Sequence, residues 1–205
     1  MMENNCFSSR KDRIKLCFPP NTKAVLFEES DYFKSSYRRK IQGRRNVDYW
    51  TTDQATVMFI EVKVYCSTDN KNNPKSIHER ISNEDPSQLT EKFLGSYEDF
   101  IAIEKKINEC SGFLRFKENP TNRLKKDCLF LYATDSKETM NSMESLLGSL
   151  STETSNELKQ KLEAEGDKFI DIVDIKNMKD IQIMNPEQLF EKGFLTNYEI
   201  LPNPE

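Results

Sequence analysis

Short apolar runs alternate with longer polar stretches along this 205-residue chain. Runs that are rich in β-branched and aromatic side chains predict strands. The strongest is VMFIEVKVYC at 57–66, and the continuous run CLFLYA at 128–133 is typical of a buried parallel strand. The remaining strand predictions are weaker and cover 13–18, 24–27, 47–50 and 169–175.

Apolar residues recur at near-helical spacing from Leu89 to Ile107, and Asp85 before them is a favourable N-cap. This pattern predicts a helix from Pro86 to about Cys110. Three weaker predictions are a loop over 67–84, a polar helix over 136–165 and a short helix from Asn185-Pro186. The order of strands, helix, strand, helix and strand indicates a single domain with an α/β or α+β layered fold.

The composition excludes several classes of protein. Hydrophobic residues make up 36% and charged residues 31%, but 13 Phe and 7 Tyr argue against wholesale disorder. No apolar run is long enough to span a membrane, and the N-terminus has no apolar stretch of signal-peptide length. We therefore expect a cytoplasmic protein with no membrane partner.

The five cysteines are irregularly spaced and form no CxxC pair. This pattern predicts reduced, mostly buried thiols rather than a zinc site or a disulfide framework. The lone histidine, His78, lies in a polar stretch with no partner at metal-ligand spacing, which indicates a surface histidine. Catalysis by a Ser–His or Cys–His pair is therefore disfavoured.

Charge is unevenly distributed although the net charge is only −4. Residues 1–47 hold 11 Lys/Arg and 5 Asp/Glu, whereas 48–205 hold 19 Lys/Arg and 29 Asp/Glu. The basic residues peak over 34–45, where they could neutralise phosphates. The alternative is a solvated basic loop. The candidate nucleic-acid-binding residues are Lys34, Arg38, Arg39, Lys40, Arg44 and Arg45.

The predicted strand 57–66 carries two charges on one face. Because side chains alternate along a strand, Glu61 and Lys63 share a face with Val57 and Phe59. Burying a charge costs several kcal/mol unless it is paired or coordinated, so a strand that served only the core would carry apolar residues at both positions. The alternative is a solvent-facing ion pair on a one-sided sheet.

A second acid, Asp48, precedes Glu61 in the chain, and a turn over 51–55 would fold the two segments into a hairpin. Two converging carboxylates suit a hard divalent cation such as Mg²⁺. The cation would polarise a phosphoryl oxygen and lower the pKa of a bound water. Lys63 would orient that water or stabilise charge on the phosphate.

Asp48 followed by Glu61-Val62-Lys63 in an apolar strand resembles the PD-(D/E)XK nuclease superfamily, although Val47 replaces the proline of that pattern. The resemblance implies a restriction-endonuclease-like mixed central sheet flanked by helices, with a core over about 24–135 and a C-terminal elaboration over 136–205. It implies Mg²⁺-dependent phosphodiester hydrolysis, with Mn²⁺ as a substitute, in nucleic acid, with DNA favoured over RNA. The biological process would be restriction, repair or phage defence. A homodimer or a larger complex would suit cleavage of both strands of a DNA duplex.

The resemblance also assigns roles to residues. Asp48, Glu61 and Val62 would bind the metal, and Asp48, Glu61, Lys63 and Gln88 would be catalytic. Lys92 is a further candidate one turn after Gln88. Either Glu28 or Glu29 could complete the metal site, and the sequence leaves that choice open.

The acid-x-Lys triplet alone is a weak signal, because it occurs six times in this chain. The main rival is Asp174-Ile175-Lys176, which has no hairpin acid at a suitable distance upstream. Two other functions also remain open: a catalytically inactive nucleic-acid-binding subunit of the same fold, and a protein-interaction module that uses the polar C-terminal helices.

Overall fold

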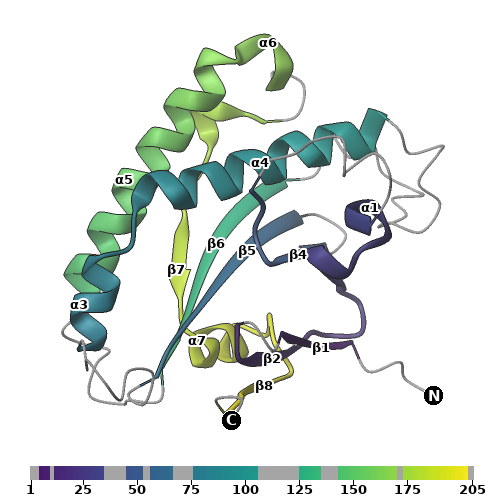
Figure 1. The fold of residues 1–205 in the computed structure, drawn as a ribbon. Helices are drawn as coiled ribbons and strands as arrows, with labels where there is room; N and C mark the ends of the chain where they lie inside the picture. Colours follow the sequence, from purple (N-terminus) through teal and green to yellow (C-terminus); the bar gives the residue numbers. More distant parts are fainter. Residues whose placement is uncertain are drawn as a thin grey trace.

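The computed structural model describes residues 5–9, 12–34, 45–52, 56–66, 76–105, 125–134, 143–169 and 173–202 (Figure 1). These residues form a mixed α/β structure with two sheets. The five-stranded sheet has the order β3 (Lys23–Leu26), β4 (Tyr49–Thr52), β5 (Thr56–Tyr65), β6 (Lys125–Thr134) and β7 (Gln182–Met184). The three-stranded sheet has the order β1 (Cys6–Ser9), β2 (Ile14–Cys17) and β8 (Asn197–Ile200).

The helical elements follow the same chain. The long helices are α4 (Pro86–Lys105) and α5 (Glu144–Ala164). The short ones are η1 (Phe27–Glu29), α1 (Asp31–Lys34), α3 (Ile77–Ser82), α6 (Gly166–Phe169), η4 (Ile175–Asn177) and α7 (Pro186–Glu191).

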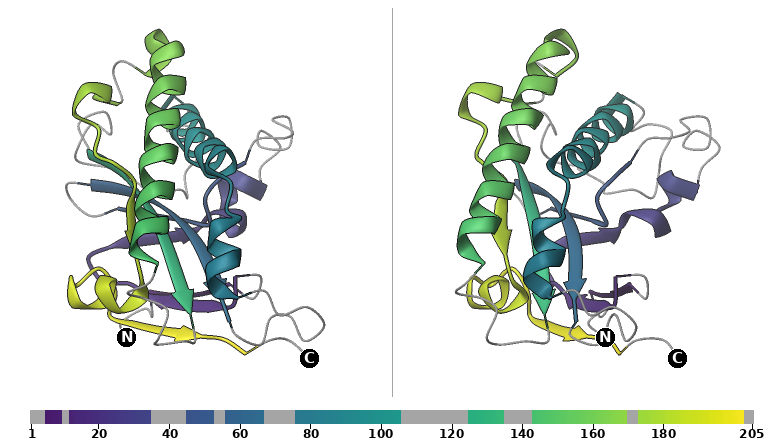
Figure 2. Two further views of the ribbon diagram at one scale, coloured as in Figure 1. Left: turned by 90° about the vertical axis from the view of Figure 1, so that its left-hand side faces the viewer. Right: turned by 60° about the vertical axis from the view of Figure 1, so that its left-hand side comes forward.

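The five-stranded sheet is the middle layer. Helices α4 and α5 cover one face, and the three-stranded sheet and α7 lie against the other (Figure 2). Strands β3, β4 and β5 are antiparallel neighbours, whereas β5, β6 and β7 run parallel. Parallel neighbours need a crossover connection, and α4 and α5 belong to these two crossovers.

The alternation along β5 explains why both of its faces are buried. Phe59 packs into the helix-side core with Trp50, whose ring stacks on Phe27 at 5.0 Å between centroids. Met58 and Ile60 pack into the opposite core. The predicted strand at 57–66 is confirmed as β5, and 128–133 is confirmed as part of the parallel strand β6.

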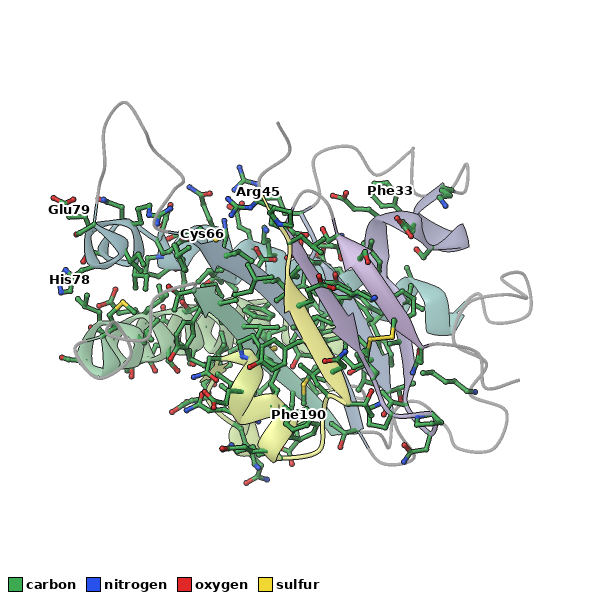
Figure 3. All side chains as sticks on the ribbon, turned by 90° about the horizontal axis from the view of Figure 1, so that it is seen from below. Phe33, Arg45, Cys66, His78, Glu79 and Phe190 are labelled. Carbon is green, nitrogen blue, oxygen red and sulfur yellow. A yellow bond between two sulfur atoms is a disulfide. The ribbon has the colours of Figure 1, made fainter. Side chains whose placement is uncertain are left out.

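The helix predicted from Pro86 is confirmed as α4 up to Lys105, and the helix predicted at 136–165 is confirmed as α5 from Glu144 to Ala164. The predicted helical residues 106–110 and 136–142 lie outside the described residues. The predicted loop at 67–84 is wrong in part, because it contains α3. The signal was present in the sequence: Ser76 and Glu79 form a reciprocal capping box. His78 and Glu79 point outward from α3, so the surface histidine is confirmed (Figure 3).

The predicted strand at 169–175 is wrong. Phe169 ends α6, Ile175 begins η4, and 170–172 lie outside the described residues. Phe169 and Val173 are both buried, and the Val173 N–H donates to the Phe169 carbonyl at 2.9 Å, as in a helical turn. Two apolar residues four positions apart lie on one face of a helix and also on one face of a strand. The sequence pattern therefore did not distinguish the two structures. The strand in this part of the chain is β7, which begins later, at Gln182.

The cysteine prediction is wrong for one pair. Cys6 and Cys17 face each other in the register of β1 and β2, with 4.0 Å between their Cα atoms, and form a disulfide. Because that pairing depends on the strand register, spacing alone did not show it. Cys66 and Cys128 are buried free thiols as predicted, and Cys110 lies outside the described residues.

The C-terminal part of the chain joins both sheets. It supplies β7 to the edge of the five-stranded sheet and β8 to the edge of the three-stranded one. Among the described helices, none combines the length and the apolar character needed to cross a bilayer.

Candidate functional site

Asp48 and Glu61 lie side by side on the helix-covered face of the large sheet. Asp48 immediately precedes β4, and continuing the pairing of Tyr49 with Ile60 by one step sets Asp48 opposite Glu61. Asp48 Oδ2 accepts a 2.8 Å hydrogen bond from the Val62 N–H. The side chains are almost enclosed, with exposures of 6% for Asp48 and 0% for Glu61. The predicted meeting of the two acids is therefore present in the structure.

Glu61 has an unusual environment for a carboxylate. Its Oε1 is in contact with the Lys92 ammonium from α4, and its Oε2 is buried with no hydrogen-bond partner in the described part of the chain. Burial raises the pKa of Glu61 to about 8, the nearby Asp48 charge adds to the rise, and Lys92 opposes it. A buried acid with one unpartnered oxygen beside a second acid favours a proton or a cation.

Lys63 lies on the same face but points to another acid. Its side chain is 39% exposed, and its Nζ lies 3.9 Å from Glu84 Oε2. The Tyr65 hydroxyl donates to the other oxygen of Glu84 at 2.8 Å. Lys63 therefore belongs to the outer, solvent-reaching part of the site, and Lys92 is the cation that contacts Glu61.

Helix α4 also holds the chain segment that leads into Asp48. The Val47 N–H donates to Ser96 Oγ at 3.2 Å, and Asn46 Nδ2 donates to Asp99 Oδ2 at 2.8 Å. On the other flank, the Asp48 carbonyl accepts from the Phe27 N–H at 2.8 Å. These bonds fix the backbone on both sides of the Asp48 carboxylate.

Sequence reasoning missed the roles of Glu84, Ser96 and Asp99. The signal for two of them was the spacing of Lys92, Ser96 and Asp99, which places three polar side chains on one stripe of a helix that is otherwise apolar on that side. No sequence pattern singled out Glu84, because its position depends on how α3 leads into α4.

The other predicted metal and catalytic residues lie as follows. Gln88 is exposed on α4, one turn before Lys92. The side chain of Val62 is buried in the core opposite the helices, so only its main-chain carbonyl could be a metal ligand. Glu28 and Glu29 are both exposed in η1.

The basic segment is described only at its ends. Lys34 is exposed at the end of α1, and Arg45 is half exposed with its Nε 3.9 Å from Glu91 Oε2. The other predicted phosphate-binding residues, Arg38, Arg39, Lys40 and Arg44, lie outside the described residues.

The rival triplet does not lie on a strand. Asp174 is the exposed N-cap of η4, where its side chain accepts from the Asn177 N–H, and Lys176 is exposed. Within the described ranges no group of three or more His, Cys, Asp and Glu side chains is arranged to hold a metal ion, so the carboxylates of the candidate site are a pair.

Comparisons with protein-family models, with curated proteins and with solved structures found no match for this chain.

Proposed function

We propose that this protein is a metal-dependent nuclease that hydrolyses phosphodiester bonds in nucleic acid, with DNA favoured over RNA. The observation that carries the proposal is the buried pair of Asp48 and Glu61 on neighbouring strands, with Glu61 Oε2 unpartnered among the described residues. Two enclosed carboxylates repel each other unless a positive charge or a proton lies between them.

The residues fit a hard divalent cation such as Mg²⁺ or Mn²⁺. Asp48 and Glu61 would bind it, and the main-chain carbonyl of Val62 is the further candidate ligand, because oxygen donors are what such ions prefer. A cation bound there would polarise a phosphoryl oxygen and lower the pKa of a bound water.

The two lysines of the site have different tasks. Lys92 favours the ionised form of Glu61, because its charge lowers the pKa of that carboxyl. Lys63 reaches solvent, so its ammonium can approach a phosphate and stabilise charge that develops there. Arg45 and Lys34, both exposed, would contact the nucleic-acid backbone.

The order of elements supports the same proposal. An acid stands at the start of one hairpin strand, Glu61-Val62-Lys63 stands on the next, and a helix and a parallel strand follow. This is the order that the PD-(D/E)XK resemblance implies.

The test is cleavage of plasmid, single-stranded DNA and RNA with Mg²⁺ or Mn²⁺, against an EDTA control. We expect Glu61→Gln and Lys63→Ala each to lower the cleavage rate ~100-fold or more, as loss of a catalytic group does. The matched controls are Glu187→Gln and Lys176→Ala, which change the same residue types at exposed positions. Metal-dependent cleavage that survives Glu61→Gln would contradict the proposal.

The second candidate is a nucleic-acid-binding subunit that does not cleave. The contact between Lys92 and Glu61 favours it, because the protein itself then supplies a cation to the acid pair. Mn²⁺ binding followed by electron paramagnetic resonance separates the two candidates. Binding that is lost in Glu61→Gln supports the nuclease, whereas salt-sensitive DNA binding with no Mn²⁺ bound supports the second candidate.

A further inference from the structure

Glu84 is an acid beside the candidate site that has no task in the proposed function. Its Oε2 lies 3.9 Å from the Lys63 ammonium, and its Oε1 accepts a hydrogen bond from the Tyr65 hydroxyl at 2.8 Å. Because side chains alternate along β5, Glu61, Lys63 and Tyr65 share the helix-covered face. Glu84 thus contacts the two side chains that follow Glu61 on this face.

The backbone that carries Glu84 is held at the end of β5. Glu84 lies between α3 and α4, and its N–H donates to the Ile81 carbonyl at 3.0 Å. Arg80 of α3 donates from Nη2 to the carbonyl of Cys66, directly after β5, at 2.6 Å. The Arg80 guanidinium also lies 5.8 Å from the centre of the Tyr65 ring. These contacts keep the connection between the two helices beside the strand.

Tyr65 fixes the orientation of the Glu84 carboxylate. Tyr65 is 5% exposed and packs in the helix-side core, so its ring is held by its neighbours. Burial raises the pKa of Tyr65 well above its ordinary value, and the Glu84 charge adds to the rise, so the hydroxyl stays protonated and remains a donor. One Glu84 oxygen is thereby held, and the other is directed at Lys63.

The pair of Lys63 and Glu84 differs from an ordinary surface ion pair. In such a pair both side chains lose freedom when they adopt one geometry, which offsets most of the attraction. Here the acid is already held, so only the half-exposed Lys63 side chain has to be ordered. A separation of 3.9 Å is too long for a hydrogen bond, so this contact attracts the ammonium without occupying one of its N–H donors.

We propose that Glu84 is a positioning residue that holds the Lys63 ammonium at the solvent side of the acid pair, where it can approach a substrate phosphate, and that Tyr65 holds Glu84 in turn. This role rests on the proposed nuclease function. Lys92 is the cation that contacts Glu61, so the two lysines are held by different acids. Glu84 acts through Lys63 and touches no reacting atom.

The test is a double-mutant cycle on the rate of cleavage with Mg²⁺. We expect Glu84→Gln to lower the rate ~10-fold where Lys63 is present and to have no further effect in a Lys63→Ala chain, because Glu84 acts only through that lysine. Tyr65→Phe should also lower the rate only where Lys63 is present. The matched controls are Glu187→Gln on α7 and Tyr198→Phe on β8, both outside the site.

A second readout does not depend on cleavage. Carbon-13 relaxation of the Lys63 ε-methylene group measures how ordered this side chain is, and the order parameter should fall in both Glu84→Gln and Tyr65→Phe. A Glu84→Gln effect of equal size with and without Lys63, or an order parameter that neither variant changes, would overturn the positioning role alone. An unaltered chain that does not cleave would contradict the nuclease function and this role together.

Discussion

The Asp48 carboxylate accepts a hydrogen bond from the backbone of Val62, the residue next to Glu61 on the neighbouring strand. One buried acid is thus tied to the strand that carries the other. The bond holds the Asp48 carboxylate beside the strand that carries Glu61. Burial is the main cause of the raised pKa of Glu61, and the charge of Asp48, held nearby in this way, adds to the rise.

The raised pKa of Glu61 makes folding stability depend on pH. The folded protein keeps a proton on Glu61 up to about pH 8, whereas the unfolded chain releases it near the ordinary glutamate pKa of 4.5. Between these values the folded state binds more protons, so this group's contribution to stability is lost as pH rises. We expect the free energy of unfolding of Glu61→Gln to fall less than that of the unaltered protein between pH 5 and 8, by up to about 1.4 kcal/mol per pH unit.

Urea denaturation at several pH values measures the difference, with the fluorescence of the buried Trp50, the one tryptophan of the sequence, as the signal. Glu187→Gln is the control, because that side chain is exposed. Parallel pH profiles for Glu61→Gln and the unaltered protein would show that Glu61 ionises normally.

Ser96→Ala should destabilise the protein by about 1–3 kcal/mol. The substitution leaves the buried Val47 N–H without the acceptor that Ser96 Oγ provides at 3.2 Å. Ser149→Ala on α5 is the matched control, because it makes the same change on a helix where the hydroxyl is exposed. Equal denaturation midpoints for the two variants would contradict an anchoring role for Ser96.

The sequence predicted the part of the site that lies within one hairpin. The alternation in β5 and the upstream Asp48 are local patterns, and the strand pairing that joins them spans few residues. Lys92 and Ser96 reach the site only because α4 crosses back over the sheet, and that crossing angle depends on packing in the whole core. The same limit applies to β7 and β8, whose short segments become strands only beside β6 and β2.

Reduction of the Cys6–Cys17 disulfide should lower the free energy of unfolding by up to about 3 kcal/mol, since the bond closes a short loop of the unfolded chain. The measurement is urea denaturation with and without a thiol reductant. A double variant with serine at both positions should be insensitive to the reductant, which separates this bond from effects on Cys66 and Cys128. A reductant effect of the same size in the double variant would contradict the assignment.

Lys92→Ala should raise the pKa of Glu61 above its value of about 8. The Lys92 ammonium is the group that lowers that pKa, through its charge and its hydrogen bond, whereas burial and Asp48 both raise it. Carbon-13 NMR of the Glu61 carboxyl across a pH titration measures the shift directly. Lys168→Ala is the control, because it removes a lysine from an exposed ion-pair cluster with Glu98 and Glu165. A Glu61 titration that is unchanged in Lys92→Ala would show that the buried pair of acids, and not the lysine above it, sets the protonation of the site.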